Sequence, residues 1–427
     1  MPKPPSIRGV FSGFVLSVWF DVPLNISIRA EQSPRWFLMG ATSVHALLGR
    51  RRELLKVVLV SDYYFPHVGG GVERVVEELA HNLLKFGHEV RVVTFNPDGW
   101  PSEEVIDGIE IVRIPSINLQ PMVGVPAAVN AGLGIRRFFE DADVIHTHNV
   151  FFLLSLLTAL SRPKAPIITT MHVGSLANLT GLTGAVGRLY ERTVGRFILR
   201  KSKAVTVVSS SVAEHAAEIG ADAPIQIVPN SVDVERFRPA ATLEGEAETD
   251  RSVLFLGRFS RNKGPQYLVE AIPRVMSEIP EATFAFVGDG PLRASMARRM
   301  RELGLNGNVR IHGKVPDVVP VIQRAGVVAR PSLTEGMPLA VMEAMACGRP
   351  ILATRVGGTT DLIADGETGM LMEPRDVEAL EDGLIRVLTN RGQAAAMGRR
   401  AREWAERQMT WERVSRMYQQ VYEEVAS

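Results

Sequence analysis

The feature that most constrains the fold of this chain is an alternation of short apolar runs with amphipathic segments, which occurs in two separate series. The first series starts with an apolar run at 56–60, and a second run follows at 89–95. Between these runs, apolar residues recur at helical spacing at Val72, Val75, Val76, Leu79, Leu83 and Phe86. A strand, an amphipathic helix and another strand in this order predict a βαβ unit with parallel strands.

The alternation continues along the chain and is interrupted once. In the first series, further apolar runs lie at 109–114, 144–147, 167–171, 204–208 and 225–228. A polar segment rich in alanine and glutamate follows Pro239 at 240–250 and predicts a linker. In the second series, runs lie at 253–256, 283–287, 309–312, 327–329 and 351–353, and residues 377–426 are expected to be helical throughout. We therefore expect two doubly wound, Rossmann-like α/β domains, at 53–236 and 250–409.

Length and composition agree with two domains and exclude some partners. A chain of 427 residues exceeds the about 250–300 residues at which single cores stop growing. The formal charge of +1 gives no global field that would attract nucleic acid, so no nucleic-acid partner is expected. A single cysteine, Cys347, excludes an intramolecular disulfide and a cysteine-rich zinc site, and it favours a reducing, cytoplasmic location.

Residues 1–52 form a poorly defined extension ahead of the first predicted strand. The apolar stretch at 9–20 follows Lys3 and Arg8, but it is shorter than the ~20 residues that a membrane-spanning helix needs. No small-residue cleavage site follows it. We expect either an artefact of start-codon choice, with Met39 as the true start, or a poorly ordered extension; the alternative is a peripheral membrane anchor.

Two loops contain residues that suit phosphate groups. Gly69-Gly70-Gly71 precedes a predicted helix, where free backbone N–H groups favour an anion; a flexible turn is the alternative. Arg258 and Lys263 lie on the loop that leaves the first strand of the second series, where two cations suit a diphosphate. The alternative for this pair is solvated surface charge.

Two glutamates, Glu335 and Glu343, are eight residues apart around the start of a predicted helix. Pro338 suits the first turn of that helix, which leaves the N–H groups near Gly336, Met337 and Leu339 open to a ligand. Carboxylates accept hydrogen bonds from the paired hydroxyls of sugars and ribose. Taken alone, the pair also fits a capping carboxylate followed by an exposed helical glutamate.

Three histidines lie at or near predicted strand ends. His172 follows the run at 167–171, a position in which a histidine is more often structural than catalytic. His146 and His148 alternate like strand residues, but no third ligand is evident nearby. We therefore expect no metal site.

The segment from Glu335 to Glu343 is identified as the E-x7-E pattern of the family 4 retaining glycosyltransferases. Other segments resemble the same family in the same order, and the resemblance extends from about residue 55 to the C-terminus: 229–239, 257–264, 287–291 and 353–358. The resemblance implies the GT-B fold, with two Rossmann-like domains and an interdomain cleft. It places the donor nucleotide on the C-terminal domain and the acceptor mainly on the N-terminal one, to which a last helix at 410–427 crosses back.

The resemblance also implies a role for each candidate residue. Arg258 and Lys263 would hold the diphosphate, Glu343 the ribose, and Glu335 the hydroxyls of the transferred sugar. Gly70 and Gly71 would close over the phosphates, residues 336–339 would contribute to donor binding, and His172 would face the reacting sugar. No metal and no cofactor are implied.

The expected reaction is the transfer of a hexosyl group from a UDP- or GDP-sugar to a lipid, glycan or small molecule, with retention of the anomeric configuration. The run 61–73 resembles the catalytic subunit that adds N-acetylglucosamine to phosphatidylinositol. Basic residues interleaved with apolar ones at 188–203 are either a solvated helix face or a peripheral contact with the cytoplasmic face of a membrane.

Two other classes of function remain to be weighed. The first is a catalytically silent module that binds a nucleotide sugar or a partner, because a fold alone does not prove activity. The presence of Arg258, Lys263 and Glu335 argues against it. The second, an NAD-dependent oxidoreductase, lacks the spaced glycine fingerprint of such enzymes.

Overall fold

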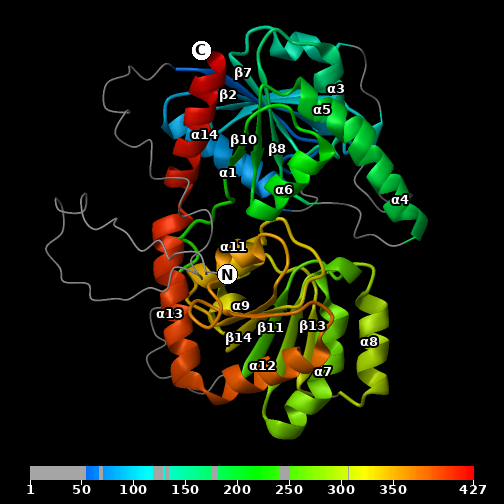
Figure 1. Ribbon diagram of the computed structural model, residues 1–427, viewed down its shortest axis with the longest axis vertical. Coiled ribbons are helices and arrows are strands. Elements are labelled where there is room, and N and C mark those ends of the chain that lie inside the picture. Colours follow the sequence, from blue (N-terminus) through cyan, green and yellow to red (C-terminus); the bar gives the residue numbers. More distant parts are fainter. Residues whose placement is uncertain are drawn as a thin grey trace, which may run out of the picture. The chain divides into compact units, whose positions relative to one another are not determined.

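The structure is a computed structural model that describes residues 54–66, 71–118, 128–129, 134–174, 181–240, 251–305 and 307–427. All of these residues belong to one compact unit, Pro34–Ser427. The predicted extension at 1–52 and the predicted linker, apart from Ala240, lie outside them. The described residues form two α/β lobes, each built on one mainly parallel sheet (Figure 1).

The first lobe contains an eight-stranded sheet in the order β10-β9-β8-β7-β1-β2-β4-β3. Its strands are β1 (Lys56–Val60), β2 (Glu89–Asn96), β3 (Glu103–Ile106), β4 (Ile109–Pro115), β7 (Val144–His148), β8 (Ile167–Met171), β9 (Ala204–Val207) and β10 (Ile225–Ile227). Neighbouring strands are parallel except β3, which pairs with β4 in an antiparallel hairpin at the sheet edge. The separate pair β5 (Ile117–Asn118) and β6 (Ala128–Val129) is also antiparallel.

Helices cover both faces of the first sheet. They are α1 (Val72–Lys85), η3 (Ile135–Phe139), α3 (Leu153–Ser161), α4 (Gly181–Tyr190), the π-helical turn η5 (Glu191–Gly195), α5 (Arg196–Lys201) and α6 (Ser210–Ile219). Successive residues of β1 pack on opposite sides, because Val57 and Leu59 join the cluster with α1, whereas Val58 and Val60 join the cluster with η3 and α3. A parallel strand that is buried on both faces explains the continuous apolar run from Val57 to Val60.

The second lobe contains a six-stranded parallel sheet in the order β13-β12-β11-β14-β15-β16. Its strands are β11 (Ser252–Leu256), β12 (Thr283–Val287), β13 (Val309–His312), β14 (Val327–Arg330), β15 (Ile351–Thr354) and β16 (Met370–Met372). The helices of this lobe are η6 (Arg261–Lys263), α7 (Pro265–Glu278), α8 (Arg293–Glu302), α9 (Val319–Gln323), α10 (Leu339–Ala346), α11 (Thr359–Leu362), α12 (Val377–Thr389) and α13 (Arg391–Gln408). Val253 and Phe255 pack on one face, and Leu254 and Leu256 on the other. The predicted fold class, two doubly wound α/β lobes, is confirmed.

The last helix, α14 (Trp411–Ala426), packs on the first lobe although it follows the second. It lies beside α1 (Figure 1), and Trp411, Tyr418 and Tyr422 are buried in the same cluster as Val57 and Leu59. The segment expected to be helical throughout is therefore three helices. It is interrupted at Asn390 and at Met409–Thr410, where the Thr410 side chain accepts the N–H of Arg413 and begins α14.

Candidate active site

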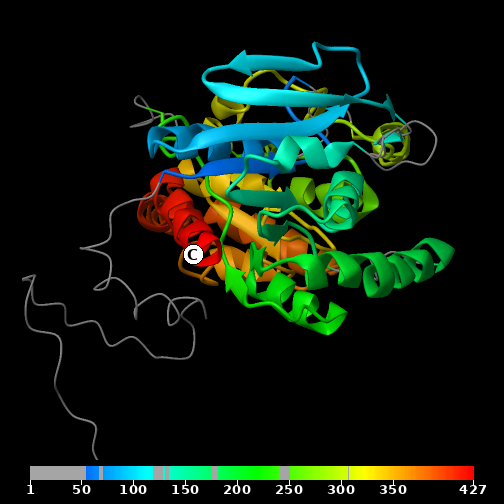
Figure 2. The same ribbon diagram turned by 90° about the horizontal axis from the view of Figure 1, so that it is seen from above.

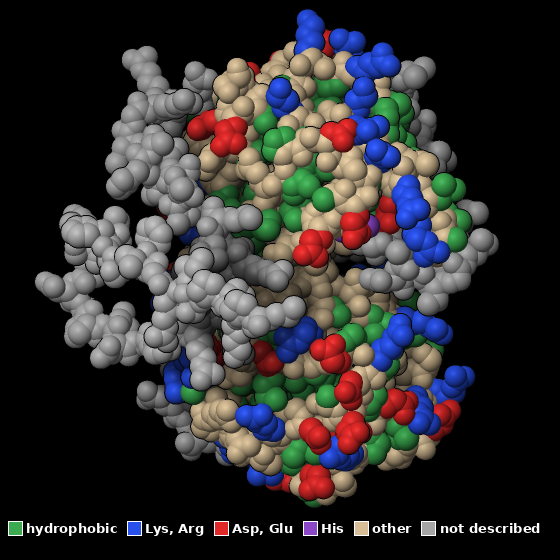
Figure 3. Space-filling model, in the orientation of Figure 1, with side chains coloured by type: hydrophobic (Ala, Val, Ile, Leu, Met, Phe, Trp, Pro, Cys, Tyr) green, Lys and Arg blue, Asp and Glu red, His purple; other side chains and the backbone are tan. Residues whose placement is uncertain are grey.

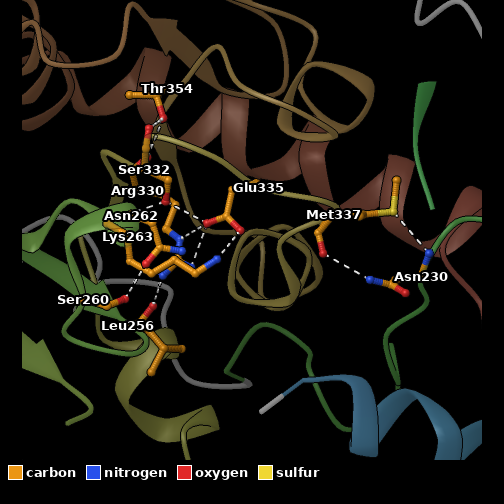
Figure 4. Close-up of polar contacts among 10 residues, drawn as sticks. All are labelled: Asn230, Leu256, Ser260, Asn262, Lys263, Arg330, Ser332, Glu335, Met337 and Thr354. Atoms are coloured by element: carbon orange, nitrogen blue, oxygen red, sulfur yellow. Dashed lines mark hydrogen bonds and ion pairs between the residues drawn. The ribbon is translucent and has the colours of Figure 1, made fainter. Parts of the chain in front are cut away.

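The centre of the site is a buried carboxylate, Glu335, on the loop between β14 and α10. One of its oxygens, Oε2, lies 2.6 Å from Lys263 Nζ. The other, Oε1, accepts hydrogen bonds from Arg330 Nε at 2.9 Å and from Ser332 Oγ at 2.7 Å, as Figure 4 shows. Arg330 in turn donates to the Leu256 carbonyl at 2.7 Å. The cluster therefore joins the ends of β11 and β14, which are neighbouring parallel strands.

The surrounding cations decide the charge of Glu335. Burial alone would raise the pKa of its carboxyl, but Arg330 and Lys263 outweigh burial and lower this pKa to about 2. Burial lowers the pKa of Lys263, and Glu335 opposes that shift. Glu335 is therefore ionised, with both oxygens engaged before any ligand binds.

The backbone around Lys263 explains how the loop holds its position. Gly264 has φ +75° and is the N-cap of α7, and a side chain there would collide with the Pro331 carbonyl. The N–H of Leu333 donates to the Asn262 carbonyl at 2.8 Å. Glycine is thus required at 264 both for the left-handed backbone and for the close approach of the two loops.

Arg258 differs from Lys263, although both were predicted to hold a diphosphate. Its side chain is exposed, and it forms no ion pair with any residue in the described part of the chain. Lys263, in contrast, forms an ion pair with Glu335. The structure thus places one exposed cation and one half-buried, ion-paired cation on the loop between β11 and α7.

Glu343 lies inside α10, and its residue is only 7% exposed. Its Oε1 is 3.2 Å from Nη1 of Arg74, which belongs to α1 of the first lobe. Burial raises the pKa of Glu343 to about 7, against the opposing effects of Arg74, Arg236 and Arg330. The alternative of an exposed helical glutamate at this position is wrong, because packing of α10 against the lobe interior removes the side chain from water.

The loop at 336–339 runs against the first lobe. A side chain at Gly336 would collide with the His172 carbonyl, so glycine permits this close approach. The Met337 carbonyl accepts a hydrogen bond from Asn230 Nδ2 at 3.1 Å (Figure 4). Pro338 is the N-cap of α10 rather than a residue of its first turn, and Leu339 is the first helical residue.

The glycine-rich loop is described only in part. Gly70 lies outside the described residues, whereas Gly71 is the N-cap of α1. Leu339 Cδ1 lies 3.0 Å from the position that a Cβ would take at Gly71. Gly71 is therefore beside the start of α10.

The three histidines gather at the carboxyl ends of β7 and β8. His148 Nδ1 lies 3.0 Å from His172 Nε2, and His146 Nδ1 lies 2.7 Å from the Tyr422 hydroxyl. Burial lowers the pKa of His172 to about 4, an effect that Asn230 opposes, so His172 is neutral near pH 7. Within the described ranges, no three His, Cys, Asp or Glu side chains are arranged to hold a metal ion.

Three residues of this region were not predicted from the sequence. Arg330 and Ser332 bind Glu335 directly, and Arg74 binds Glu343. Arg330 could have been predicted from the sequence, because a charged residue at the end of a buried parallel strand needs a partner of opposite charge. Arg74 could not have been predicted in this way, because its contact joins residues 269 positions apart in the chain.

The fold and the charged side chains at the strand ends define a GT-B glycosyltransferase. The structure is similar to Anabaena HepE, which was solved with UDP and glucose, with a TM-score of 0.70 at 16% identity over 87% of this chain and 100% of that one. A likeness at this level of identity supports the fold.

Sequence comparison identifies the family. Residues 69–236 match the model of Glycosyltransferase Family 4, and residues 242–404 match that of Glycosyl transferases group 1. The chain is 30% identical over 388 residues to the phosphatidyl-myo-inositol mannosyltransferase of Mycobacterium tuberculosis, covering 87% of this chain and 97% of that protein. It is 27% identical to the N-acetyl-alpha-D-glucosaminyl L-malate synthase of Bacillus anthracis, covering 84% and 95%. The chain belongs to this glycosyltransferase family and is a glycosyltransferase.

Proposed function

We propose that this enzyme transfers a hexosyl group from a UDP- or GDP-sugar to an acceptor with retention of configuration. The observation that carries the proposal is the pair of buried carboxylates on either side of the start of α10. Glu335 precedes this helix and is held by Lys263, Arg330 and Ser332. Glu343 lies within the helix. Carboxylates accept hydrogen bonds from hydroxyl groups, whereas a helix N-terminus favours phosphate, so the two features together suit a ligand that offers both groups.

In this proposal each donor group has its own partners. Arg258 and Lys263 bind the diphosphate, Glu343 binds the ribose, and Glu335 binds hydroxyls of the transferred sugar. Gly70 and Gly71 close over the phosphates, and residues 336–339 line the donor site. His172, adjacent to Gly336, faces the reacting sugar as a neutral hydrogen-bonding group. No metal or cofactor takes part.

The proposed reaction proceeds on one face of the sugar. The bond between the anomeric carbon and the phosphate oxygen breaks, and the acceptor oxygen forms its bond to that carbon from the same side. The proton of the acceptor passes to the departing phosphate. No side chain is proposed as a nucleophile. Arg258, Lys263 and the N-terminus of α10 stabilise the charge that develops on the departing phosphate.

The acceptor that we propose is a lipid, a glycan or a small molecule bound mainly by the first lobe. The named activities of the two relatives above support a lipid or a small molecule. Phosphatidylinositol is one such lipid, in agreement with the resemblance of residues 61–73 to an N-acetylglucosaminyltransferase subunit. The alternative of a silent binding module is not favoured, because these relatives are named as transferases or synthases.

A lipid acceptor is consistent with the surface of α4 and α5. Helix α4 projects from the first lobe (Figure 2) and exposes Val186 and Leu189, which are 58% and 65% exposed. Exposed basic residues continue along the same segment: Arg188, Arg192, Arg196, Arg200, Lys201 and Lys203. Figure 3 shows Lys and Arg side chains along the edge of the lobe where α4 and α5 lie. None of the described helices is both long and apolar enough to cross a membrane.

We therefore propose a cytoplasmic enzyme that contacts the membrane peripherally through this surface. The test is sedimentation of the protein with vesicles of phosphatidylcholine alone or with added phosphatidylserine. Binding is expected only with the anionic lipid. It is expected to fall in the single variant Leu189→Glu and in the double variant Arg188→Glu, Arg192→Glu. Equal binding by these variants would contradict the membrane contact without affecting the sugar chemistry.

The proposed chemistry is tested with purified protein and UDP-glucose, UDP-N-acetylglucosamine, UDP-galactose and GDP-mannose. Thermal stabilisation and slow donor hydrolysis identify the donor, and Lys263→Ala and Glu343→Ala are expected to lose both effects. Arg299→Ala, which alters an exposed ion pair with Glu270 on α7, serves as the control. If no donor binds, or if both variants behave like the wild type, the site assignment is wrong.

A further inference from the structure

The two lobes are joined by an ion pair at the carboxylate that we assign to ribose. Arg74, in the first turn of α1, places Nη1 3.2 Å from Glu343 Oε1 in α10. A second contact lies close by, since Leu339 at the start of α10 approaches Gly71 at the start of α1. The start of α1 therefore meets α10 at two points, its first residue Leu339 and the carboxylate of Glu343, and the second contact is charged.

We propose that Arg74 is a positioning residue for the donor. From the first lobe it fixes the orientation of Glu343 and favours the ionised form of this carboxylate, which accepts hydrogen bonds from the ribose hydroxyls. The inference rests on the proposed function, because that function assigns the ribose to Glu343.

The geometry of the contact allows Arg74 and a ribose to share Glu343. Arg74 uses one nitrogen and approaches one oxygen, so Oε2 forms no hydrogen bond with any side chain in the described ranges. An ionised carboxylate accepts about four hydrogen bonds through its two oxygens. A ribose hydroxyl can therefore donate to Oε2 while the guanidinium holds Oε1.

The charges around Glu343 explain why it needs this partner. Burial raises the pKa of the Glu343 carboxyl to about 7, and the charge of Arg74 opposes this rise more than those of Arg236 and Arg330. Arg236 and Arg330 are also engaged elsewhere, with Asp317 at 3.2 Å and with Glu335 at 2.8 Å.

One further titratable group interacts electrostatically with Glu343, the thiol of Cys347 at the C-cap of α10. Burial raises the pKa of that thiol to about 12, so it is neutral near pH 7. A protonated Glu343 would offer the ribose a weaker acceptor than a carboxylate does. Loss of Arg74 therefore raises the pKa of Glu343 further and moves donor binding to higher pH.

The test is calorimetric titration of the full chain with UDP and with GDP between pH 6 and pH 9. In Arg74→Gln we expect nucleotide affinity to fall roughly fivefold or more at pH 7, because each unit of pKa is a factor of about ten in protonation equilibrium. The affinity is expected to approach that of the wild type at pH 9. Arg74→Lys keeps the charge and is expected to retain most of the affinity at each pH.

Arg299→Gln is the matched control. The Arg299 side chain is 44% exposed and pairs with Glu270, and that of Arg74 is 46% exposed and pairs with Glu343. The control is expected to bind like the wild type. Wild-type affinity of Arg74→Gln at every pH would overturn the inference, as would a loss of equal size at pH 7 and pH 9.

Glu343→Gln separates this inference from the proposed function. If Glu343→Gln binds both nucleotides like the wild type, the ribose assignment fails and the inference fails with it. If Glu343→Gln weakens binding and abolishes its pH dependence, but Arg74→Gln has no effect, only the role of Arg74 is wrong.

Discussion

At the residue scale, Glu335 shows how the protein keeps a carboxylate charged in a buried position. Three side chains reach its two oxygens, and two of them carry a positive charge. Arg330 is held at a second point as well, because it also donates to the Leu256 carbonyl. Removing one member leaves the others with fewer partners for a buried charge, which costs more than the pair itself contributes.

The first prediction concerns Arg330, which is buried beside Glu335. Arg330→Ala is expected to lower the free energy of unfolding by about 3–5 kcal/mol, because it leaves a buried carboxylate with fewer partners. Urea unfolding measures this change, and Arg299→Ala, in an exposed ion pair, is expected to unfold almost like the wild type. Similar losses in both variants would show that the buried cluster does not stabilise the second lobe.

The sequence predicted some residues of this site and not others, for a physical reason. Glu335, Glu343 and Lys263 follow from local spacing and from the motif they form. Arg330 and Arg74 matter through contacts across strands and between lobes, which a local pattern does not contain. The motif also did not reveal that Lys263 pairs with Glu335.

At the element scale, α3 begins with help from a residue far away in the chain. Its N-cap position, Phe152, has no side chain that can accept a hydrogen bond. The carboxylate of Asp62, just after β1, accepts the N–H groups of Leu153 and Leu154 at 2.9 and 2.8 Å instead. Sequence rules for helix starts examine adjacent residues and so miss such a cap. The sequence pattern also does not predict the short edge strand β3, because this strand is defined by its pairing with β4 rather than by an apolar run of its own.

The second prediction compares Asp62→Ala with Asp62→Asn. Both variants remove the charge, but the Asn oxygen still accepts a backbone N–H at the start of α3. We expect Asp62→Ala to be less stable than Asp62→Asn by about 1–2 kcal/mol, the usual cost of losing a cap. Thermal unfolding at one pH measures the difference, and equal stability would mean that α3 does not need the cap.

The difference in stability between the wild type and Asp62→Asn is expected to depend on pH. Burial raises the pKa of Asp62 to about 7, so between about pH 4 and pH 7 the folded protein retains a proton that the unfolded chain has lost. This contribution to stability is fully present below the unfolded pKa and is lost as the pH rises to about 7. Unfolding at pH 5 and pH 8 should therefore show Asp62→Asn gaining relative to the wild type at the higher pH.

At the scale of the whole molecule, the end of the chain belongs to both lobes. Helix α13 packs in the second lobe, and Arg402 on it donates to the carbonyls of Val234, Phe237 and Ala346, at distances of 2.7–2.8 Å. Helix α14 then packs on α1 of the first lobe. The family resemblance implied this crossing, and hydrophobic periodicity alone does not show it, because an amphipathic helix suits either lobe.

The last prediction concerns the polar contact that α14 makes inside the first lobe. The Tyr422 hydroxyl lies 2.7 Å from His146 Nδ1, and both side chains are fully buried. Burial lowers the pKa of His146 to about 3, so the ring is neutral, and the Tyr422 hydroxyl is the hydrogen-bond partner of its Nδ1. Tyr422→Phe keeps the apolar packing and leaves Nδ1 unpaired, for an expected loss of about 1–3 kcal/mol in unfolding free energy. Tyr267→Phe, on α7 of the second lobe, is the control; if both variants lose equally little in urea unfolding, packing alone holds α14 to the first lobe.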